Sequence, residues 1–281
     1  MAMIDDVKNE MEELISKYTD WWRSRPNFDK WKDKKIHDEY GKDSVINTIK
    51  HYVPDLSNKR ILDLGCGMGG MSVAFILNNI RNVISIDLNV DYCKITKLRG
   101  LKYGLQMNIV NGVAEFIPLK DNSIDVVIMS EVIEHVDDPE LVLNEINRIL
   151  RLDGKVFITV VNKYTIKDPH YHMFFINWLP KNIAEMYIKL RKKDKKYDFK
   201  DRQKLSEMHY FTFSEFEKLA NKYGFEVIDI FMDKILHPEN IHNSNLKNKI
   251  KFMKKLRINK LLYKIAKLFM VQSYSLLLIK K

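Results

Sequence analysis

Cysteine is scarce in this sequence, and long apolar runs are absent from it. The two cysteines, Cys66 and Cys93, are too few for a disulfide framework, and neither has the spacing of a metal-binding pair. No run of about 18 apolar residues occurs, and the chain does not open with a basic segment followed by an apolar one. We therefore expect a cytoplasmic protein without a transmembrane span.

Acidic residues are missing from the last part of the chain. Residues 240–281 contain 11 Lys and Arg and no Asp or Glu. The remaining 36 basic residues are balanced by 37 acidic ones, so the net charge of +10 comes from this one segment. A local basic surface can meet phosphate groups of lipid, nucleic acid or substrate, and the charge alone does not choose among them.

Apolar residues recur at helical spacing within that segment and predict a basic helix over about 246–269, in an insertion of about 244–270. This helix could pack on the domain, lie peripherally on the inner face of an anionic membrane, or hold a phosphate-bearing acceptor. A nucleic-acid partner is not expected, because the sequence has neither aromatic sheet signatures nor Cys or His knuckles. The apolar positions are Ile250, Met253, Leu261, Ile265 and Leu268.

The stretch from Arg60 to Gly70 reads as a strand, a glycine turn and the start of a helix. Alternating glycines allow positive φ and let a ligand lie against the main chain. The pattern also fits the dinucleotide fingerprint, so it is ambiguous alone. Asp63, two residues before the first glycine, would repel a pyrophosphate and attract an ammonium group. The turn therefore favours a cationic, amino-acid-like nucleotide ligand.

Apolar runs alternate with helical patterns from this point on, which is typical of a parallel sheet. We predict an α/β fold: a Rossmann-like, seven-stranded, mostly parallel sheet with helices on both faces, a helical N-terminal flap and helical insertions. The predicted strands are 60–64, 82–87, 107–111, 124–129, 155–161, 226–230 and 274–279. The predicted helices are 70–77, 90–101, 139–150 and 212–223, the last with Ser214 as a possible N-cap and Gly224 as its stop.

Residues 1–58 form a predicted helical cap, followed by the main α/β domain over 59–281 with a lid insertion at about 163–210. Met11, Leu14, Ile15 and Tyr18 have helical spacing. The cap either packs over the core or also walls a substrate pocket. The aromatic residues available for such a wall are Trp21, Trp22, Trp31 and Tyr40.

An acid ends the second predicted strand, about 20 residues after the glycine turn. Asp87 could accept both ribose hydroxyl protons at the carboxyl edge of the sheet, or it could cap the next helix. Its coupling to the glycine turn favours the ribose role. The adjacent Leu88 could cover one face of an adenine.

The segment from Asn111 to Pro139 resembles class I methyltransferases of the ubiquinone-biosynthesis type. The likeness lies in a glycine turn, an acidic strand entry, Glu134-His135-Val136 after the strand and an Asp-Pro helix start. It implies S-adenosylmethionine as cofactor. The family usually has Asp at Val113, so the adenine contact passes to a backbone group or to Glu115. The implied cofactor residues are Asp63, Gly65, Cys66, Gly67, Asp87, Leu88, Val113, Ala114, Glu115 and Ser130.

Two histidine sites could serve the chemistry of methyl transfer, which needs a base only where the acceptor must lose a proton. His170, oriented by Asp168, is the preferred base, and His135 is the second catalytic candidate. Some related quinone methyltransferases bind a metal through a cluster like Glu131, Glu134 and His135, which would share one helical face. Packing or capping is the favoured role of these three residues, and no metal is assigned.

The acceptor that we expect is a hydroxyl on a glycan, a lipid-linked molecule or a quinone-like small molecule. An RNA methyltransferase, a catalytically silent interaction subunit and a nicotinamide-dependent oxidoreductase remain alternatives. The sequence leaves the oligomeric state open.

Overall fold

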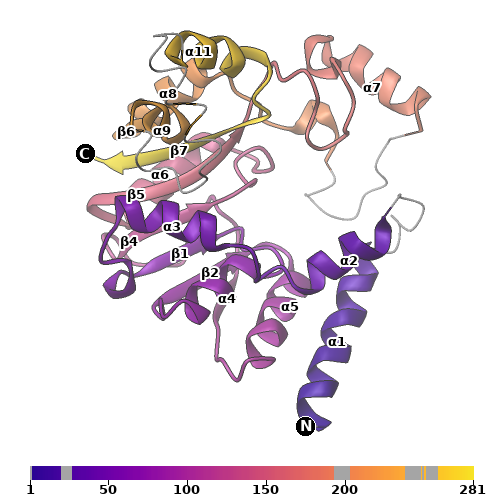
Figure 1. Cartoon of the computed structure of the whole chain (residues 1–281), viewed down its shortest axis with the longest axis vertical. Helices are drawn as coiled ribbons and strands as arrows, with labels where there is room; N and C mark the ends of the chain where they lie inside the picture. The colour runs from indigo at the N-terminus through magenta and orange to yellow at the C-terminus, as the bar shows by residue number, and fades with distance from the viewer. Residues whose placement is uncertain (1, 20–26, 193–202, 238–247, 249, 251–258) are drawn as a thin grey trace. The chain divides into compact units, whose positions relative to one another are not determined.

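A computed structural model of the chain describes residues 2–19, 27–192, 203–237, 248, 250 and 259–281 (Figure 1). Trp21, Trp22 and Met253, which the sequence singled out, lie outside these residues. The chain divides into two compact units, which are described separately below. Unit 1 comprises residues 1–129 and 148–154, and unit 2 comprises residues 130–147 and 155–281.

Seven strands form one sheet, in the order β3-β2-β1-β4-β5-β7-β6. Its parallel pairs include β1 with β2, β1 with β4, and β2 with β3, whereas β7 runs antiparallel to both neighbours. This is the predicted Rossmann-like, mostly parallel sheet. The strands are β1 Ile61–Leu64, β2 Val83–Asp87, β3 Asn108–Asn111, β4 Ile124–Met129, β5 Leu150–Val161, β6 Phe225–Asp229 and β7 Ser273–Lys280.

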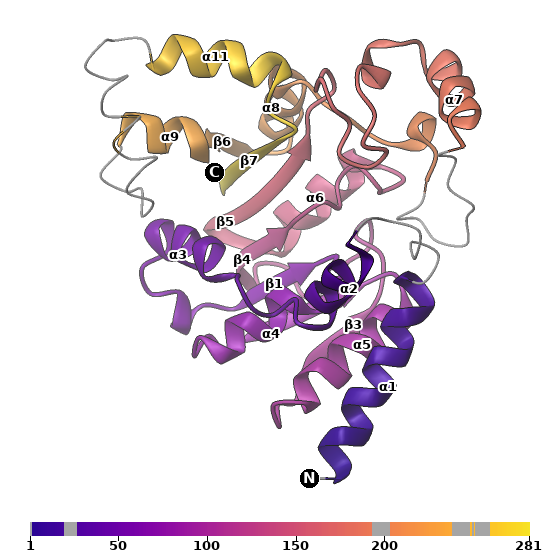
Figure 2. The ribbon, with the colours of Figure 1, turned by 45° about the vertical axis from the view of Figure 1, so that its right-hand side comes forward.

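Unit 1 holds the glycine turn between β1 and helix α4 (Gly70–Leu77) (Figure 2). All four residues of β1 are buried, as expected for a central parallel strand. Helix α5 (Val90–Leu101) follows β2 and begins at Asn89, whose side chain accepts from the backbone N–H groups of Asp91 and Tyr92. Both helices have the bounds that the sequence predicts.

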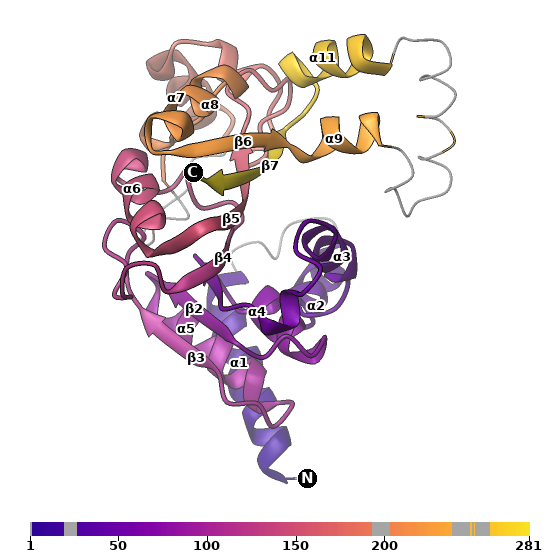
Figure 3. The ribbon, with the colours of Figure 1, turned by 90° about the vertical axis from the view of Figure 1, so that its left-hand side faces the viewer.

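Among the described residues, three helices precede the sheet: α1 (Ala2–Thr19), α2 (Phe28–Ile36) and α3 (Asp43–Tyr52), with a short 3₁₀ turn at Leu56–Asn58. Helix α1 lies along α5 (Figure 3). Its residues Met11, Ile15 and Tyr18 are buried, and the Tyr18 hydroxyl donates to Asp91 Oδ2 at 2.6 Å. The predicted helical spacing therefore marks the face of α1 that packs on the unit.

A buried guanidinium joins these N-terminal helices to the glycine turn. Arg99 of α5 is fully buried and donates to the carbonyl oxygens of Met68, Lys35 and Ile36 at 2.7–2.8 Å. It also forms an ion pair with the buried carboxylate of Glu39. Burial alone would raise the pKa of Glu39, but hydrogen bonds from Lys102 and Tyr103 and the charge of Arg99 lower it to about 2.

Unit 2 contains the last strands and the helices around them. The chain enters α8 (Phe213–Lys222) through a capping box in which Thr212, and not the predicted Ser214, is the N-cap. Thr212 Oγ1 reaches the N–H of Glu215, three residues on, which Ser214 inside the first turn cannot do. Gly224 follows the helix with φ of 79°, as predicted. The structure also describes the helices α6 Pro139–Ile149, η3 Ile176–Trp178, α7 Lys181–Leu190, η5 Leu205–Glu207, α9 Ile230–Leu236 and α11 Asn259–Phe269.

Replacing Glu39 tests the importance of the buried pair. Glu39→Gln leaves the Arg99 charge buried without its counter-charge, so we expect a loss of about 3–5 kcal/mol in the free energy of unfolding, measured in urea at neutral pH. Because the pKa of Glu39 is lowered from 4.5 to about 2, the difference between wild type and variant should be complete above about pH 4.5 and shrink as the pH falls towards 2.

The exposed pair of Glu10 and Lys94 supplies the matched control. Glu10→Gln should cost less than about 1 kcal/mol. Equal losses for the two variants would show that the Arg99 pair contributes no more than a surface ion pair.

Candidate functional site

The glycine turn of unit 1 leaves room for a ligand at one glycine in particular. Gly67 has φ of 55°, and a Cβ built there would meet no atom within 4 Å. Gly69 differs, because its Cβ would collide with the side chain of Thr96 at 2.5 Å. Gly69 therefore serves close packing, whereas the space beside Gly67 is open to a bound molecule.

Asp87 is not the N-cap of α5, which is Asn89, but its carboxylate lies between the glycine turn and the start of that helix. Its Oδ2 accepts from the N–H of Gly67 at 2.7 Å, and its Oδ1 accepts from the N–H of Asn89 at 2.8 Å. One carboxylate thus holds the glycine turn and the start of α5 together. Asn111 reinforces this corner, because its side-chain amide donates to the carbonyl oxygens of Asp87 and Leu88. No role for the Asn111 side chain was predicted from the sequence.

Asp63 and Cys66 lie in the buried wall of the turn. The Asp63 carboxylate accepts from the hydroxyl of Ser72, which in turn accepts from Ser85. Burial, with a further contribution from the charge of Asp87, raises the pKa of Asp63 to about 6. Burial also raises the pKa of the Cys66 thiol well above its usual value, so this cysteine is not an activated nucleophile.

The predicted adenine segment follows β3 in the same unit. Glu115 is buried, Val113 and Ala114 are half-buried, and Leu88 is exposed. Phe116 is a large exposed aromatic residue next to them that the sequence analysis passed over. Ser130 is exposed and comes directly after β4, at the first position of unit 2.

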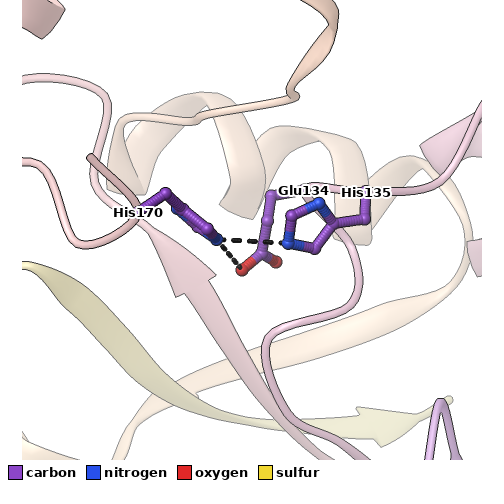
Figure 4. A group of neighbouring side chains, drawn as sticks. All are labelled: Glu134, His135 and His170. Atoms are coloured by element: carbon purple, nitrogen blue, oxygen red, sulfur yellow. Dashed lines mark hydrogen bonds and ion pairs between the residues drawn. The ribbon is translucent and has the colours of Figure 1, made fainter. Parts of the chain in front are cut away.

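In unit 2, both candidate histidines meet at one buried carboxylate (Figure 4). The Nε2 atoms of His135 and His170 lie 3.1 Å apart, and His170 Nε2 lies 3.8 Å from Glu134 Oε1. Glu134 is fully buried, and neither of its carboxylate oxygens has a hydrogen-bond partner among the described residues. Burial raises the pKa of this carboxyl to about 8.

Surrounding hydrogen bonds determine which nitrogen of His170 carries a proton. Asp168 is buried and accepts from four donors, one of them the hydroxyl of Tyr210 at 3.0 Å. Burial and the charge of Asp168 raise the pKa of Tyr210, so it keeps the one proton that it donates to Asp168. His170 Nδ1, 2.8 Å from the Tyr210 oxygen, must then donate, which leaves the lone pair on Nε2.

Hydrogen bonds also determine which nitrogen of His135 carries a proton. The side-chain amide of Gln203 donates through Nε2 to the His135 carbonyl at 3.2 Å, so its oxygen faces His135 Nδ1 at 3.3 Å. Because an amide oxygen only accepts, His135 also donates through Nδ1. Two imidazole lone pairs therefore point at each other beside Glu134. The cluster favours binding one proton or another cation.

These contacts refine the sequence analysis in two respects. Asp168 contacts His170 through the Tyr210 hydroxyl and through the backbone N–H of His170. The expectation that Glu131, Glu134 and His135 share a helical face is wrong. The segment is a series of turns, and Glu131, exposed with φ of 57°, donates its N–H to Thr159 Oγ1.

A metal could be held by a different set of ligands from the one weighed in the sequence. One donor atom each from Glu134, His135 and His170 lies within 4.8 Å of the others. His170 therefore replaces Glu131 as the third candidate metal ligand. Two imidazole nitrogens and a carboxylate oxygen suit a zinc-like cation.

Comparison with known proteins identifies the family. The family model described as a methyltransferase domain matches residues 62–158, from β1 into β5. An uncharacterized protein of Methanocaldococcus jannaschii is 31% identical over 171 residues, which cover 57% of this chain and 71% of that protein. The chain belongs to the class I S-adenosylmethionine-dependent methyltransferases. The glycine turn is therefore that of a methyltransferase, whose cofactor is S-adenosylmethionine.

A relative of this methyltransferase that carries an enzyme name matches over 148 residues. The ubiquinone biosynthesis O-methyltransferase of Cupriavidus pinatubonensis is 28% identical over 148 residues, which cover 51% of this chain and 54% of that enzyme. The chain thus spans about half the length of this relative. Among solved structures, a methyltransferase of Thermotoga maritima, described as a possible histamine N-methyltransferase, aligns with a TM-score of 0.45 and 20% identity. That alignment covers 77% of this chain and 83% of the other.

Whether the open space at Gly67 takes the cofactor can be tested by filling it. Gly67→Ala should weaken binding of S-adenosylmethionine at least about tenfold by calorimetry, because the added Cβ occupies the space and strains a positive φ. Gly104→Ala is the matched control, since Gly104 also has positive φ and no atom near its Cβ position. The control should lose similar stability and keep cofactor affinity. Unchanged affinity in Gly67→Ala would remove this glycine from the cofactor site.

Proposed function

We propose that this methyltransferase transfers the methyl group of S-adenosylmethionine to a hydroxyl oxygen, on a glycan, a lipid-linked molecule or a quinone-like small molecule. The arrangement of His135, His170 and Glu134 supports a hydroxyl acceptor. An amine can attack the sulfonium as its neutral form, whereas a hydroxyl has to lose a proton to become a good nucleophile. A cluster built to receive a proton is useful in the second case.

In this proposal His170 is the general base, and His135 is its neighbour. The fixed Nδ1 protons leave both Nε2 atoms as acceptors, so the acceptor's proton would arrive at Nε2 of His170 and be shared across the 3.1 Å separation. The buried Glu134 carboxyl stabilises the resulting imidazolium by its charge, or shares the proton with it.

The cofactor site has separate tasks in this scheme. The open space at Gly67 would take the methionine end of S-adenosylmethionine, with Asp63 and Cys66 in the wall behind it. Asp87 and Leu88 would face the ribose and the adenine, and residues 113–115 would border the adenine. Ser130 would complete the cofactor set. Bound there, S-adenosylmethionine supplies the methyl group as an electrophile.

Removing His170 tests the base. His170→Ala should lower kcat at least about a hundredfold with a hydroxyl acceptor, while S-adenosylmethionine binding stays unchanged. Transfer of a labelled methyl group to a catechol and to an alkyl glycoside, with ethanolamine as the amine probe, provides the measurement. The wild-type rate should fall as the pH is lowered, because protonation of the histidine pair removes the base.

Two controls accompany this variant. His172 is an exposed histidine two residues away, and we expect His172→Ala to keep the wild-type kcat. A chelator should leave the rate unchanged, since the base needs no metal. Full activity of His170→Ala would refute the role of the base, and loss of activity on chelation, restored by zinc or manganese, would show that the three side chains act as metal ligands instead.

Tyr210 offers a test of the orientation of His170. Tyr210→Phe keeps the ring but removes the hydroxyl that joins Asp168 to His170 Nδ1. We expect a loss in kcat of about tenfold, smaller than for His170→Ala, together with a shifted pH profile. An unchanged pH profile would mean that Tyr210 is only a packing residue.

A further inference from the structure

Helix α11 presents an apolar stripe to the solvent. Leu261, Ile265 and Leu268 lie at positions i, i+4 and i+7, and 60%, 52% and 56% of their surfaces are exposed. A helix on a protein surface normally turns such a stripe inward. The stripe of α11 therefore has a purpose other than packing on its own unit.

The inward side of α11 is held by polar and charged groups. Lys267 Nζ lies 2.6 Å from Asp229 Oδ2 and above the ring of Phe213, and the Tyr263 hydroxyl lies 3.0 Å from both carboxylate oxygens of Asp229. These contacts determine the rotation of the helix about its axis, and they hold the apolar stripe on its outer side.

A side-chain amide fixes the C-terminal end of the helix. Asn162 is fully buried and its Nδ2 contacts the carbonyl oxygens of Lys267, Leu268 and Val271 at 2.8–3.3 Å. The last turn of a helix normally leaves such carbonyl groups without partners inside the helix. The helix is thus secured at its end as well as along its inner side.

The exposed apolar surface continues beyond the helix. The ring centroids of Phe269 and Trp178 are 5.3 Å apart, and those of Trp178 and Phe175 are 5.9 Å apart. Phe174, Phe175, Trp178 and Met270 are all exposed. A contiguous apolar and aromatic surface of this kind marks an interaction site on a protein, and Trp and Phe are favoured where apolar and aqueous phases meet.

A pocket adjoins this surface at the C-terminal end of α11. It has a volume of about 580 Å³ and includes the exposed Lys167, whose Nζ lies 5.6 Å from the centre of the Phe174 ring. A cation beside an apolar surface matches an anionic headgroup beside acyl chains. The pocket is lined by Thr165, Ile166, Lys167, Met270, Gln272 and Ser273.

We propose that this surface, which consists of the α11 stripe, the Trp178 aromatic group and the Lys167 pocket, binds the face of an anionic phospholipid bilayer. The stripe would enter the boundary between headgroups and acyl chains, with the exposed Lys260 and Lys264 at the headgroups and a lipid phosphate at Lys167. The absence of acidic residues between 240 and 281 favours a lipid surface over an ordinary protein partner.

Such contact would be peripheral. No helix within the described ranges is long and apolar enough to cross a membrane. The proposal does not depend on the acceptor or on the base, because it rests on α11 and its surroundings alone.

Vesicle sedimentation of the full chain tests the proposal. Wild type should bind vesicles of phosphatidylcholine with phosphatidylglycerol, bind vesicles of phosphatidylcholine alone more weakly, and lose affinity with rising salt. The variant Leu261→Ser/Ile265→Ser/Leu268→Ser should bind the anionic vesicles at least about tenfold more weakly. Lys260→Glu/Lys264→Glu should do the same while keeping the stripe.

The control carries two apolar-to-serine changes in unit 1, at the exposed Leu77 and Leu152. It should bind vesicles like wild type, and thermal unfolding should show that every variant is folded. The proposal is overturned if wild type fails to bind anionic vesicles at low salt, or if the stripe variant binds them as well as wild type does. It is also overturned if wild type is a dimer that the stripe variant dissociates, because the stripe would then face a second copy.

Discussion

The packing of unit 1 depends on the charge of Arg99, which is fully buried. The Arg99 guanidinium reaches the glycine turn through Met68, the end of α2 through Lys35 and Ile36, and the carboxylate of Glu39. A buried charge is tolerated only when every one of its donors is satisfied, so the turn, α2 and the segment after it have to be positioned together. The N-terminal helices are therefore part of the framework that holds the glycine turn.

The sheet and most helix bounds could be predicted because each depends on a local pattern. The glycine turn after β1, the acid that ends β2 and the periodicity of α5 lie within a few residues of the structures that they specify. Arg99 could not be singled out in the same way, because within α5 it reads as an ordinary helix residue. Its partners lie 60 to 64 residues earlier in the chain, apart from Met68.

The histidine cluster shows the same limit at the candidate active site. His135 and His170 were each recognisable from their neighbours in sequence, but nothing in the sequence indicated that their Nε2 atoms face each other beside Glu134. Tyr210 and Gln203, which fix their tautomers, come from a distant part of the chain and form no motif with them. A helical interpretation of residues 131–135 failed because Glu131 adopts a left-handed conformation.

The Asp229 carboxylate at the end of β6 contacts both α9 and α11. Asp229 accepts from the N–H groups of Phe231 and Met232 as the N-cap of α9, and it also holds Tyr263 and Lys267 of α11. When α11 detaches, Asp229 loses the cation that balances its charge, and when α9 frays, the anchor of α11 moves. In terms of local unfolding, we therefore expect helices α9 and α11 to open together.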